Sequence, residues 1–212
     1  MYSKDRATSI TKNDNKFIPA GIIEDVVLKS AKIETSPTGK EFFEITFEKN
    51  EAKLLHTEWE PTKNQYVDTD EKLQIKMDNQ YSRMLQILAC FYKLEDINFD
   101  GESFKDFAKY IVDKLNEADK SIKLRVKVVY NKDGYTTLPS YARFTFIEPM
   151  ELPEGETSKI VKLDIDQFTK PVVADKETKN DNPFANTVNT SSTLTGSENN
   201  YTTTSTNDDL PF

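Results

Sequence analysis

The stretch that decides the fold is Glu41-Phe42-Phe43-Glu44-Ile45-Thr46-Phe47-Glu48. Its apolar residues Phe43, Ile45 and Phe47 recur at every second position, with polar residues between them. Side chains of a β-strand alternate between its two faces, so this pattern predicts a strand with one buried face. Phe42 would then point outward, two residues after Lys40.

Strand and turn signals lie on both sides of this segment. Residues 21–33 are rich in β-branched residues and long enough for a bent strand. A turn follows, marked by the proline and glycine of Ser36-Pro37-Thr38-Gly39-Lys40. Residues 53–59 continue as a third strand, which predicts a three-stranded meander.

Two helices are predicted next. Apolar residues at helical spacing are Met77, Tyr81, Met84, Leu85, Leu88, Ala89 and Tyr92. Ser103 is the expected N-cap of a second helix, because its hydroxyl can accept from a free backbone N–H. The apolar face of that helix would hold Phe104, Phe107, Ala108, Ile111 and Leu115.

Strands then resume. Residues 123–130 alternate, with Leu124, Val126, Val128 and Tyr130 on one side and Lys123, Arg125 and Lys127 on the other. The Asp-Gly pair in Asn131-Lys132-Asp133-Gly134 predicts a hairpin turn. The return strand would begin at Tyr135, break at Leu138-Pro139 and continue over residues 142–147.

This order predicts a mainly β protein with helices, a β+α fold. Three strands, a helical segment and two strands match an OB-fold, a five-stranded Greek-key barrel with a helical segment between strands 3 and 4. Other β+α folds share the element count. The helical segment is longer than the minimal fold needs. It would either complete the core or form a surface for self-association or for another protein.

The predicted domains follow from this division. Residues 1–16 would be a flexible polar arm, residues 17–150 the OB-fold, and residues 151–169 a short packing arm or strand. Residues 170–212 are rich in Thr, Asn, Ser and Asp, with few large apolar residues. Such a segment buries too little surface to offset its chain entropy, so we expect a disordered acidic tail.

The charge of the chain is unevenly distributed. The 212 residues carry a net charge of −8. Residues 151–212 hold 5 Lys and 11 Asp or Glu, whereas residues 1–150 hold 23 Lys or Arg and 25 Asp or Glu. An acidic protein is an unusual nucleic-acid binder, but the near-neutral first part leaves room for a local basic groove.

Several protein classes are not expected. A single cysteine, Cys90, and a single histidine, His56, exclude an internal disulfide and a Cys/His zinc cluster. There is no nucleophile motif, two-metal carboxylate spacing or Gly-rich phosphate loop, so neither an enzyme nor a metal or other cofactor is predicted. With no signal peptide or membrane span, a cytoplasmic location is expected, meaning the host cytoplasm if the protein is phage-encoded.

Aromatic and basic residues share the polar sides of the predicted strands and their loops. Single-strand binders stack bases on aromatic rings and neutralise phosphates with cations. Alternatively, Trp59, Tyr135 and Tyr141 belong to the core. The candidate nucleic-acid contacts are Lys40, Phe42, Trp59, Lys63, Tyr66, Arg125, Lys127, Lys132, Tyr135, Tyr141 and Arg143.

The chain ends in Asp208-Asp209-Leu210-Pro211-Phe212. A terminal ring and carboxylate on a polar tail suit a partner with an apolar pocket and a nearby cation, and the two acids would steer the encounter. This tip resembles that of bacterial-type single-stranded DNA-binding proteins, including phage versions, although the family tip often has three acids and Ile before the Pro. Asp181-Asn182-Pro183-Phe184 is similar but lacks the free carboxylate.

The resemblance implies sequence-independent binding and protection of single-stranded DNA during replication, recombination and repair. It also implies recruitment of a polymerase, helicase, primase or nuclease through the tip, no membrane, and a possible homo-oligomer. A protein–protein adaptor of a replisome or virion that does not bind DNA is the main alternative, and an enzyme of unrecognised type is a weaker one.

Overall fold

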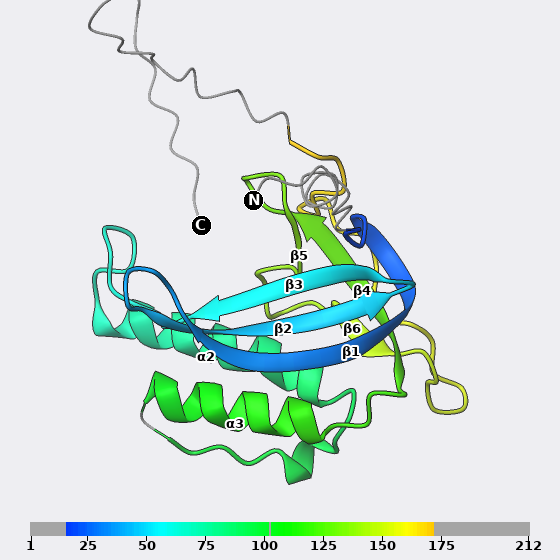
Figure 1. The fold of residues 1–212 in the computed structure, drawn as a ribbon, viewed down its shortest axis with the longest axis horizontal. Coiled ribbons are helices and arrows are strands. Elements are labelled where there is room, and N and C mark those ends of the chain that lie inside the picture. Colours follow the sequence, from blue (N-terminus) through cyan, green and yellow to red (C-terminus); the bar gives the residue numbers. More distant parts are fainter. Residues whose placement is uncertain (1–15, 102, 172–212) are drawn as a thin grey trace, which may run out of the picture. The chain divides into compact units, whose positions relative to one another are not determined.

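Six antiparallel strands and two α-helices form the part of the chain that the computed structural model describes, residues 16–101 and 103–171 (Figure 1). The predicted β+α class, with helices between the third and fourth strands, is confirmed. The elements are β1 (Gly21–Thr35), β2 (Glu41–Lys49), β3 (Ala52–Trp59), α2 (Asp70–Leu88), the 3-10 helix η1 (Leu94–Asp96), α3 (Phe104–Glu117), β4 (Lys123–Tyr130), β5 (Thr136–Thr137) and β6 (Ile147–Pro149).

The strands are hydrogen-bonded in the order β3-β2-β1-β4-β5, and β6 also pairs with β4. Within the described residues no strand pairing joins β3 to β5, so the sheet is open where the predicted barrel would close. The two strands still face each other across this seam, because the Nδ1 of His56 on β3 lies 3.3 Å from the Oγ1 of Thr137 on β5.

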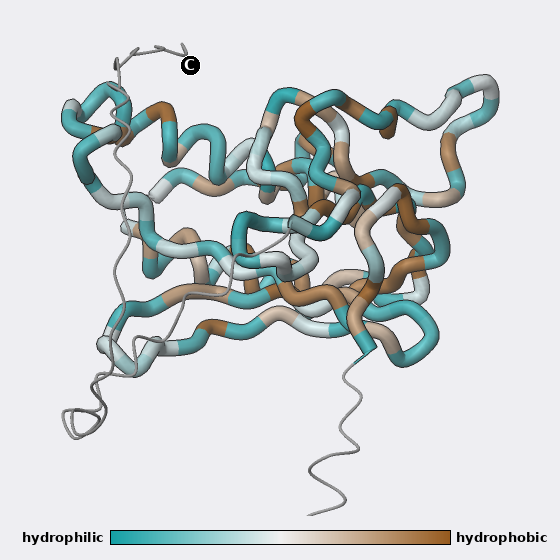
Figure 2. Tube along the Cα trace, turned by 90° about the horizontal axis from the view of Figure 1, so that it is seen from above, coloured by the Kyte–Doolittle hydropathy of each residue, from teal (hydrophilic) through white to brown (hydrophobic). Residues whose placement is uncertain are grey.

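The core lies between the sheet and the two helices. Phe43, Ile45 and Phe47 are fully buried, as their alternation predicted. They pack in one cluster with Ile111 and Leu115 of α3. In Figure 2, hydrophilic residues are concentrated in the loops, and many of the hydrophobic residues lie in the segments between these loops. The helices of the described part are too short or too polar to cross a membrane.

Both helices begin at a hydroxyl cap. Ser103 accepts a hydrogen bond from the N–H of Asp106 at 3.1 Å, so the predicted N-cap of α3 is confirmed. Thr69 caps α2 by accepting from the N–H of Lys72 at 3.2 Å. α2 therefore begins well before Met77, the first residue of the predicted pattern. None of residues 70–79 is buried, so the core-facing apolar pattern of the second half of the helix does not extend into this half.

The predicted return strand over residues 142–147 is wrong over most of its length. The side-chain amide of Gln86 on α2 donates to the carbonyl of Ala142 at 2.7 Å and accepts from the N–H of Phe146 at 3.3 Å. These bonds satisfy backbone groups that a neighbouring strand would otherwise bind. Only the short strands β5 and β6 remain in this region.

A buried carboxylate on β3 links the sheet to α2. Glu58 accepts from Nη2 of Arg83 at 2.8 Å through both oxygens, from Gln80 at 2.8 Å, and lies 3.0 Å from Nε2 of His56. Burial alone would raise the pKa of this carboxyl. The hydrogen bonds and charges of His56, Arg83 and Gln80 outweigh burial and lower the pKa to about 2.

The same guanidinium reaches across the open seam. While Nη2 and Nε of Arg83 bind Glu58, its Nη1 donates to the carbonyl of Ser140 at 3.0 Å. One side chain of α2 thus connects β3 to the segment that follows β5. We call Glu58, Arg83, Gln80 and His56 the seam network.

The segment after β6 has no helix or strand over residues 151–171, but it packs on the sheet. The N–H of Tyr130 donates to the carbonyl of Gln167 at 2.8 Å, and the N–H of Lys159 donates to Glu148 at 3.0 Å. The predicted arm before residue 16 and the tail from residue 172, including Asp181-Asn182-Pro183-Phe184 and the terminal tip, lie outside the described residues.

Replacing Arg83 by Ala should lower the free energy of unfolding by about 3 kcal/mol, since it leaves the Glu58 carboxylate buried without its main partner. Chemical denaturation measures this change. Arg143→Ala is the matched control, because Arg143 is exposed and forms no ion pair with a described residue. Equal small losses in both variants would show that the seam network does not stabilise the fold.

Stability should also fall in acid. Because the pKa of Glu58 is lower in the folded chain, its contribution is complete above about pH 4.5 and is lost as the pH falls toward 2. Of a total of roughly 3 kcal/mol, roughly 2 kcal/mol should be lost between pH 7 and pH 3. Denaturation at pH 7 and pH 3 should show a smaller difference in Glu58→Gln than in the unaltered protein, and an equal difference would contradict this role.

Candidate nucleic-acid interface

An aromatic pair lies on the outer face of β2 and β3, away from the helices. Phe42 and Trp59 are directly opposite each other in the register of the two strands. Their rings stack with centroids 4.3 Å apart and planes inclined by 27°. Trp59 is 43% exposed, so the pair offers a flat ring surface to solvent. The exposed Lys40 ends the neighbouring β1–β2 turn.

The rest of β3 follows the same alternation. Leu54, His56 and Glu58 point inward, which turns Leu55 and Thr57 outward in line with Trp59. Leu55 is an exposed apolar residue on the same strand face as Trp59 that sequence reasoning missed. The two-residue alternation of residues 54–59 would have revealed it.

The β4–β5 hairpin presents a second cation and ring. Asn131 accepts through Oδ1 from the N–H groups of Asp133 and Tyr135, at 3.0 and 2.9 Å. Gly134 takes a positive φ of 79°, as expected, whereas Asp133, the other expected positive-φ position, does not. This shape leaves Lys132 and Tyr135 exposed at the end of the hairpin.

A third group follows β5. Arg143 is exposed, and so is its neighbour Phe144, whose ring meets that of Tyr141 edge-on at 5.7 Å. The Arg83–Ser140 hydrogen bond holds this segment next to β3. Phe144 was not predicted as a contact, because residues 142–147 were expected to form a regular strand.

The β3–α2 loop carries Lys63 and Tyr66. Tyr66 is highly exposed, in a turn where its N–H donates to Oδ1 of Asn64 at 2.8 Å. Lys63 pairs with Asp70 at 2.7 Å, so its charge is partly compensated. In this loop, the ring of Tyr66 is therefore more available to a ligand than the ammonium group of Lys63.

The expectation that Lys127 faces solvent is wrong. Its side chain is 1% exposed, because the packing arm that follows β6 covers that side of β4 with Asp166. Its ammonium group lies 2.9 Å from Asp166 and donates to the hydroxyl of Tyr141 at 2.8 Å. The Tyr141 hydroxyl in turn donates to Asp166 at 2.9 Å.

Lys127, Tyr141 and Asp166 form a triad whose polar groups bind one another; Lys127 and Asp166 are buried and Tyr141 is half-buried. Burial would raise the pKa of Asp166, but hydrogen bonds from the N–H of Leu163, from Lys127 and from Tyr141 lower it. Burial and Asp166 both raise the pKa of the Tyr141 hydroxyl. The triad attaches the arm to β4, and neither the ammonium group nor the hydroxyl is open to a phosphate.

Arg125 also forms ion pairs with acidic residues of the fold. Its guanidinium donates to Glu24 at 3.1 Å and to Glu148 at 2.8 Å, and its side chain is mostly buried. It is therefore a poor candidate for a phosphate contact.

Most cations on the outer face of β1 and β2 have acidic neighbours. Lys32 lies 2.9 Å from Glu34 and 3.3 Å from Glu44, and Lys29 lies 3.4 Å from Glu48. Lys40, Lys53, Lys132 and Arg143 are exposed cations of this face and its loops that form no ion pair with a described residue. The face can thus neutralise a few phosphates rather than many.

Residues 16–101 and 103–171 contain no group of three His, Cys, Asp or Glu side chains arranged to hold a metal ion. Cys90 is buried, and burial followed by the charge of Glu148 raises the pKa of its thiol to about 12. A thiol with that pKa is a poor nucleophile at neutral pH.

Comparison with protein-family models and with curated protein sequences finds no significant match. The fold defines the class: a β+α protein with an open antiparallel sheet whose seam is bridged from a helix. The most distinctive exposed feature on its outer face is the stacked Phe42–Trp59 pair.

Proposed function

We propose that this protein binds single-stranded DNA without sequence preference and protects it during replication, recombination and repair. The observation that carries the proposal is the solvent-open Phe42–Trp59 stack on the outer face of β2 and β3. OB-folds bind oligonucleotides on the face of strands 2 and 3 and with the loops β1–β2 and β4–β5. Lys40 and the Lys132–Tyr135 hairpin occupy the corresponding loops of this chain.

The proposed fold is an OB-type barrel with an open seam. The strand order β3-β2-β1-β4-β5 is that of an OB-fold cut between its third and fifth strands. Support for this assignment also comes from the position of the helices between β3 and β4, and from the approach of His56 to Thr137.

The proposed binding mode uses stacking more than charge. A base would stack on the open ring of Trp59, and further bases on Tyr135, Phe144 or Tyr66. Such contacts tolerate any base because every base has a π-face. The ion pairs of the outer face leave about four cations for phosphates, which predicts a slope of roughly −3 in a plot of log affinity against log salt concentration.

Partner recruitment is the second part of the proposal. The tip Asp208-Asp209-Leu210-Pro211-Phe212 would dock on replication or recombination proteins, as its resemblance to single-stranded DNA-binding proteins implies. The proposed role is binding rather than catalysis. A replisome or virion adaptor that does not bind DNA would use the same tip.

Replacing Trp59 by Ala should weaken binding of a labelled oligo(dT) by about 5- to 150-fold, because one stacked base contributes about 1–3 kcal/mol. Fluorescence anisotropy measures this affinity. In the unaltered protein the single tryptophan should be quenched on titration with oligo(dT).

Leu94→Ala is the control, since Leu94 is a large exposed apolar residue on η1 rather than on the strand face. It should leave the affinity unchanged. Absence of quenching and of any anisotropy change at low salt would favour the adaptor over the DNA-binding protein.

Deleting residues 172–212 should raise the affinity for oligo(dT) at low salt. This segment holds two Lys and six Asp or Glu, so it would compete with phosphate for the exposed cations. The difference should shrink as salt screens the charges. The double variant Asp208→Asn, Asp209→Asn should show part of the gain, and unchanged affinity after the full deletion would contradict tail competition.

A further inference from the structure

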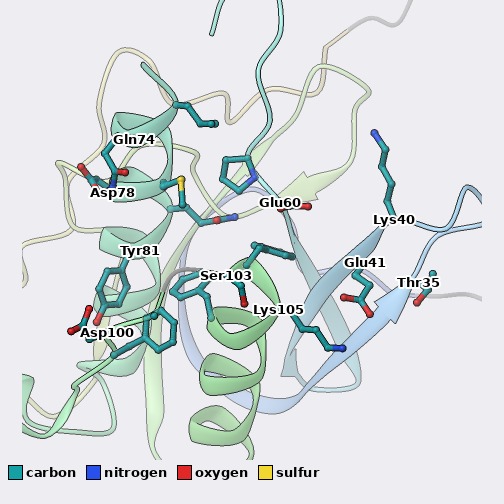
Figure 3. A pocket seen from close by; sticks show the side chains of 18 of the residues that line it. Thr35, Lys40, Glu41, Glu60, Gln74, Asp78, Tyr81, Asp100, Ser103 and Lys105 are labelled. Atoms are coloured by element: carbon teal, nitrogen blue, oxygen red, sulfur yellow. Dashed lines mark hydrogen bonds between the residues drawn. The ribbon is translucent and has the colours of Figure 1, made fainter. Parts of the chain in front are cut away.

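A cleft of about 920 Å³ lies on the helix side of the sheet, opposite the Phe42–Trp59 pair. It opens between the first halves of α2 and α3, the β1–β2 turn and the end of β3 (Figure 3). Its apolar lining comes mainly from Leu73, Met77, Tyr81, Phe99, Phe104 and Phe107. A cleft of this volume accommodates several side chains of a bound peptide.

One wall of the cleft is a helix half that the core does not cover. Residues 70–79 of α2 extend about 15 Å without a buried residue. Leu73 and Met77 are four residues apart and therefore share one side of the helix, the side that lines the cleft. Met77 is 37% exposed, so this apolar ridge faces open space.

A second wall of the cleft depends on the close approach of the Phe99 ring to the backbone at Gly101. A Cβ at Gly101 would lie 2.5 Å from the ring of Phe99, so the ring occupies space that only glycine leaves free. Phe99 also packs against Tyr81 and Phe107, with centroids 6.2 and 5.5 Å away. The aromatic lining is therefore held in place without a ligand.

The rim of the cleft is acidic. Its charged lining residues are Glu41, Glu60, Asp78, Asp100, Lys40 and Lys105, an excess of two negative charges. The four acids form no ion pair with a described residue, and Asp78 is oriented by a hydrogen bond from Gln74 at 2.8 Å. Asp78 and Asp100 lie on the same side of the cleft as Tyr81 (Figure 3).

We propose that this cleft binds a short segment of a partner protein that carries an apolar anchor residue flanked by Lys or Arg. The anchor would fill the space between the Leu73–Met77 ridge and the aromatic wall, and the flanking cations would pair with the acidic rim. Charge argues against a nucleic-acid strand and against the acidic tail of this chain as occupants. DNA binding is proposed for the other face of the strands, and Lys40 in the β1–β2 turn is the residue named for both sites.

The probes are fluorescein-labelled peptides of about twelve residues, roughly 18 Å long if helical. They carry Leu or Phe between lysines, and each has a counterpart with Glu in place of every Lys. The full-length protein should bind the basic peptides at least tenfold more tightly than their acidic counterparts. Binding should weaken as salt rises from about 0.05 to 0.5 M, because the rim charges are exposed.

Two variants of the same helix half locate the site. Met77→Ser should weaken basic-peptide binding about tenfold. Ile75→Ser should not, because Ile75 is 58% exposed but does not line the cleft. Asp100→Asn should weaken binding severalfold, whereas Glu95→Gln on η1 should have no effect. All four variants should keep the affinity of the protein for oligo(dT).

Several results would overturn the proposal. One is failure of every basic peptide to bind with a dissociation constant below about 1 mM. Another is equal weakening in Met77→Ser and Ile75→Ser. Loss of oligo(dT) affinity in Met77→Ser would instead assign the cleft to DNA, and self-association that disappears in Met77→Ser would assign it to a second copy of the chain.

Discussion

The ionised Glu58 carboxylate holds together the part of the sheet that backbone pairing leaves open. A β-barrel closes by a continuous ladder of backbone hydrogen bonds, and here no such ladder joins β3 to β5 among the described residues. Arg83 binds Glu58 on one side of the seam and Ser140 on the other. Since a buried charge is costly without partners, the position of α2 is tied to this pair.

This way of bridging the seam explains the distribution of functional groups. Because α2 reaches the inner side of β3, the outer side remains open and presents Leu55, Thr57 and Trp59. The same helix is longer than the core it packs on, and its first half continues past the sheet as a wall of the cleft. One helix thus creates both the free strand face and the cleft opposite to it.

The local sequence was sufficient to predict the structure of segments that depend only on their own neighbouring residues. The alternation of Phe43, Ile45 and Phe47, the cap at Ser103 and the Asp-Gly turn each depend on a few neighbouring residues. The inward position of Lys127 was not predictable in this way, because its partner Asp166 lies 39 positions later in a segment without regular structure. A lysine between strand residues predicts an exposed side chain unless such a partner is known.

The candidate nucleic-acid contacts fall into two groups, according to whether the side chain already has a partner within the fold. Arg125, Lys127 and Tyr141 bind acidic residues of the fold and stabilise it. Trp59, Tyr135 and Arg143 remain exposed, and Phe42 is half-buried in its stack with Trp59. A protein that uses its internal cations to attach an arm and offers rings to solvent is suited to ligands recognised by stacking. The near-neutral charge of residues 1–150 is then compatible with nucleic-acid binding, because stacking on rings needs no large positive field. The acidic rim on the helix side would repel phosphate groups, so it disfavours that cleft as a site for a nucleic-acid strand.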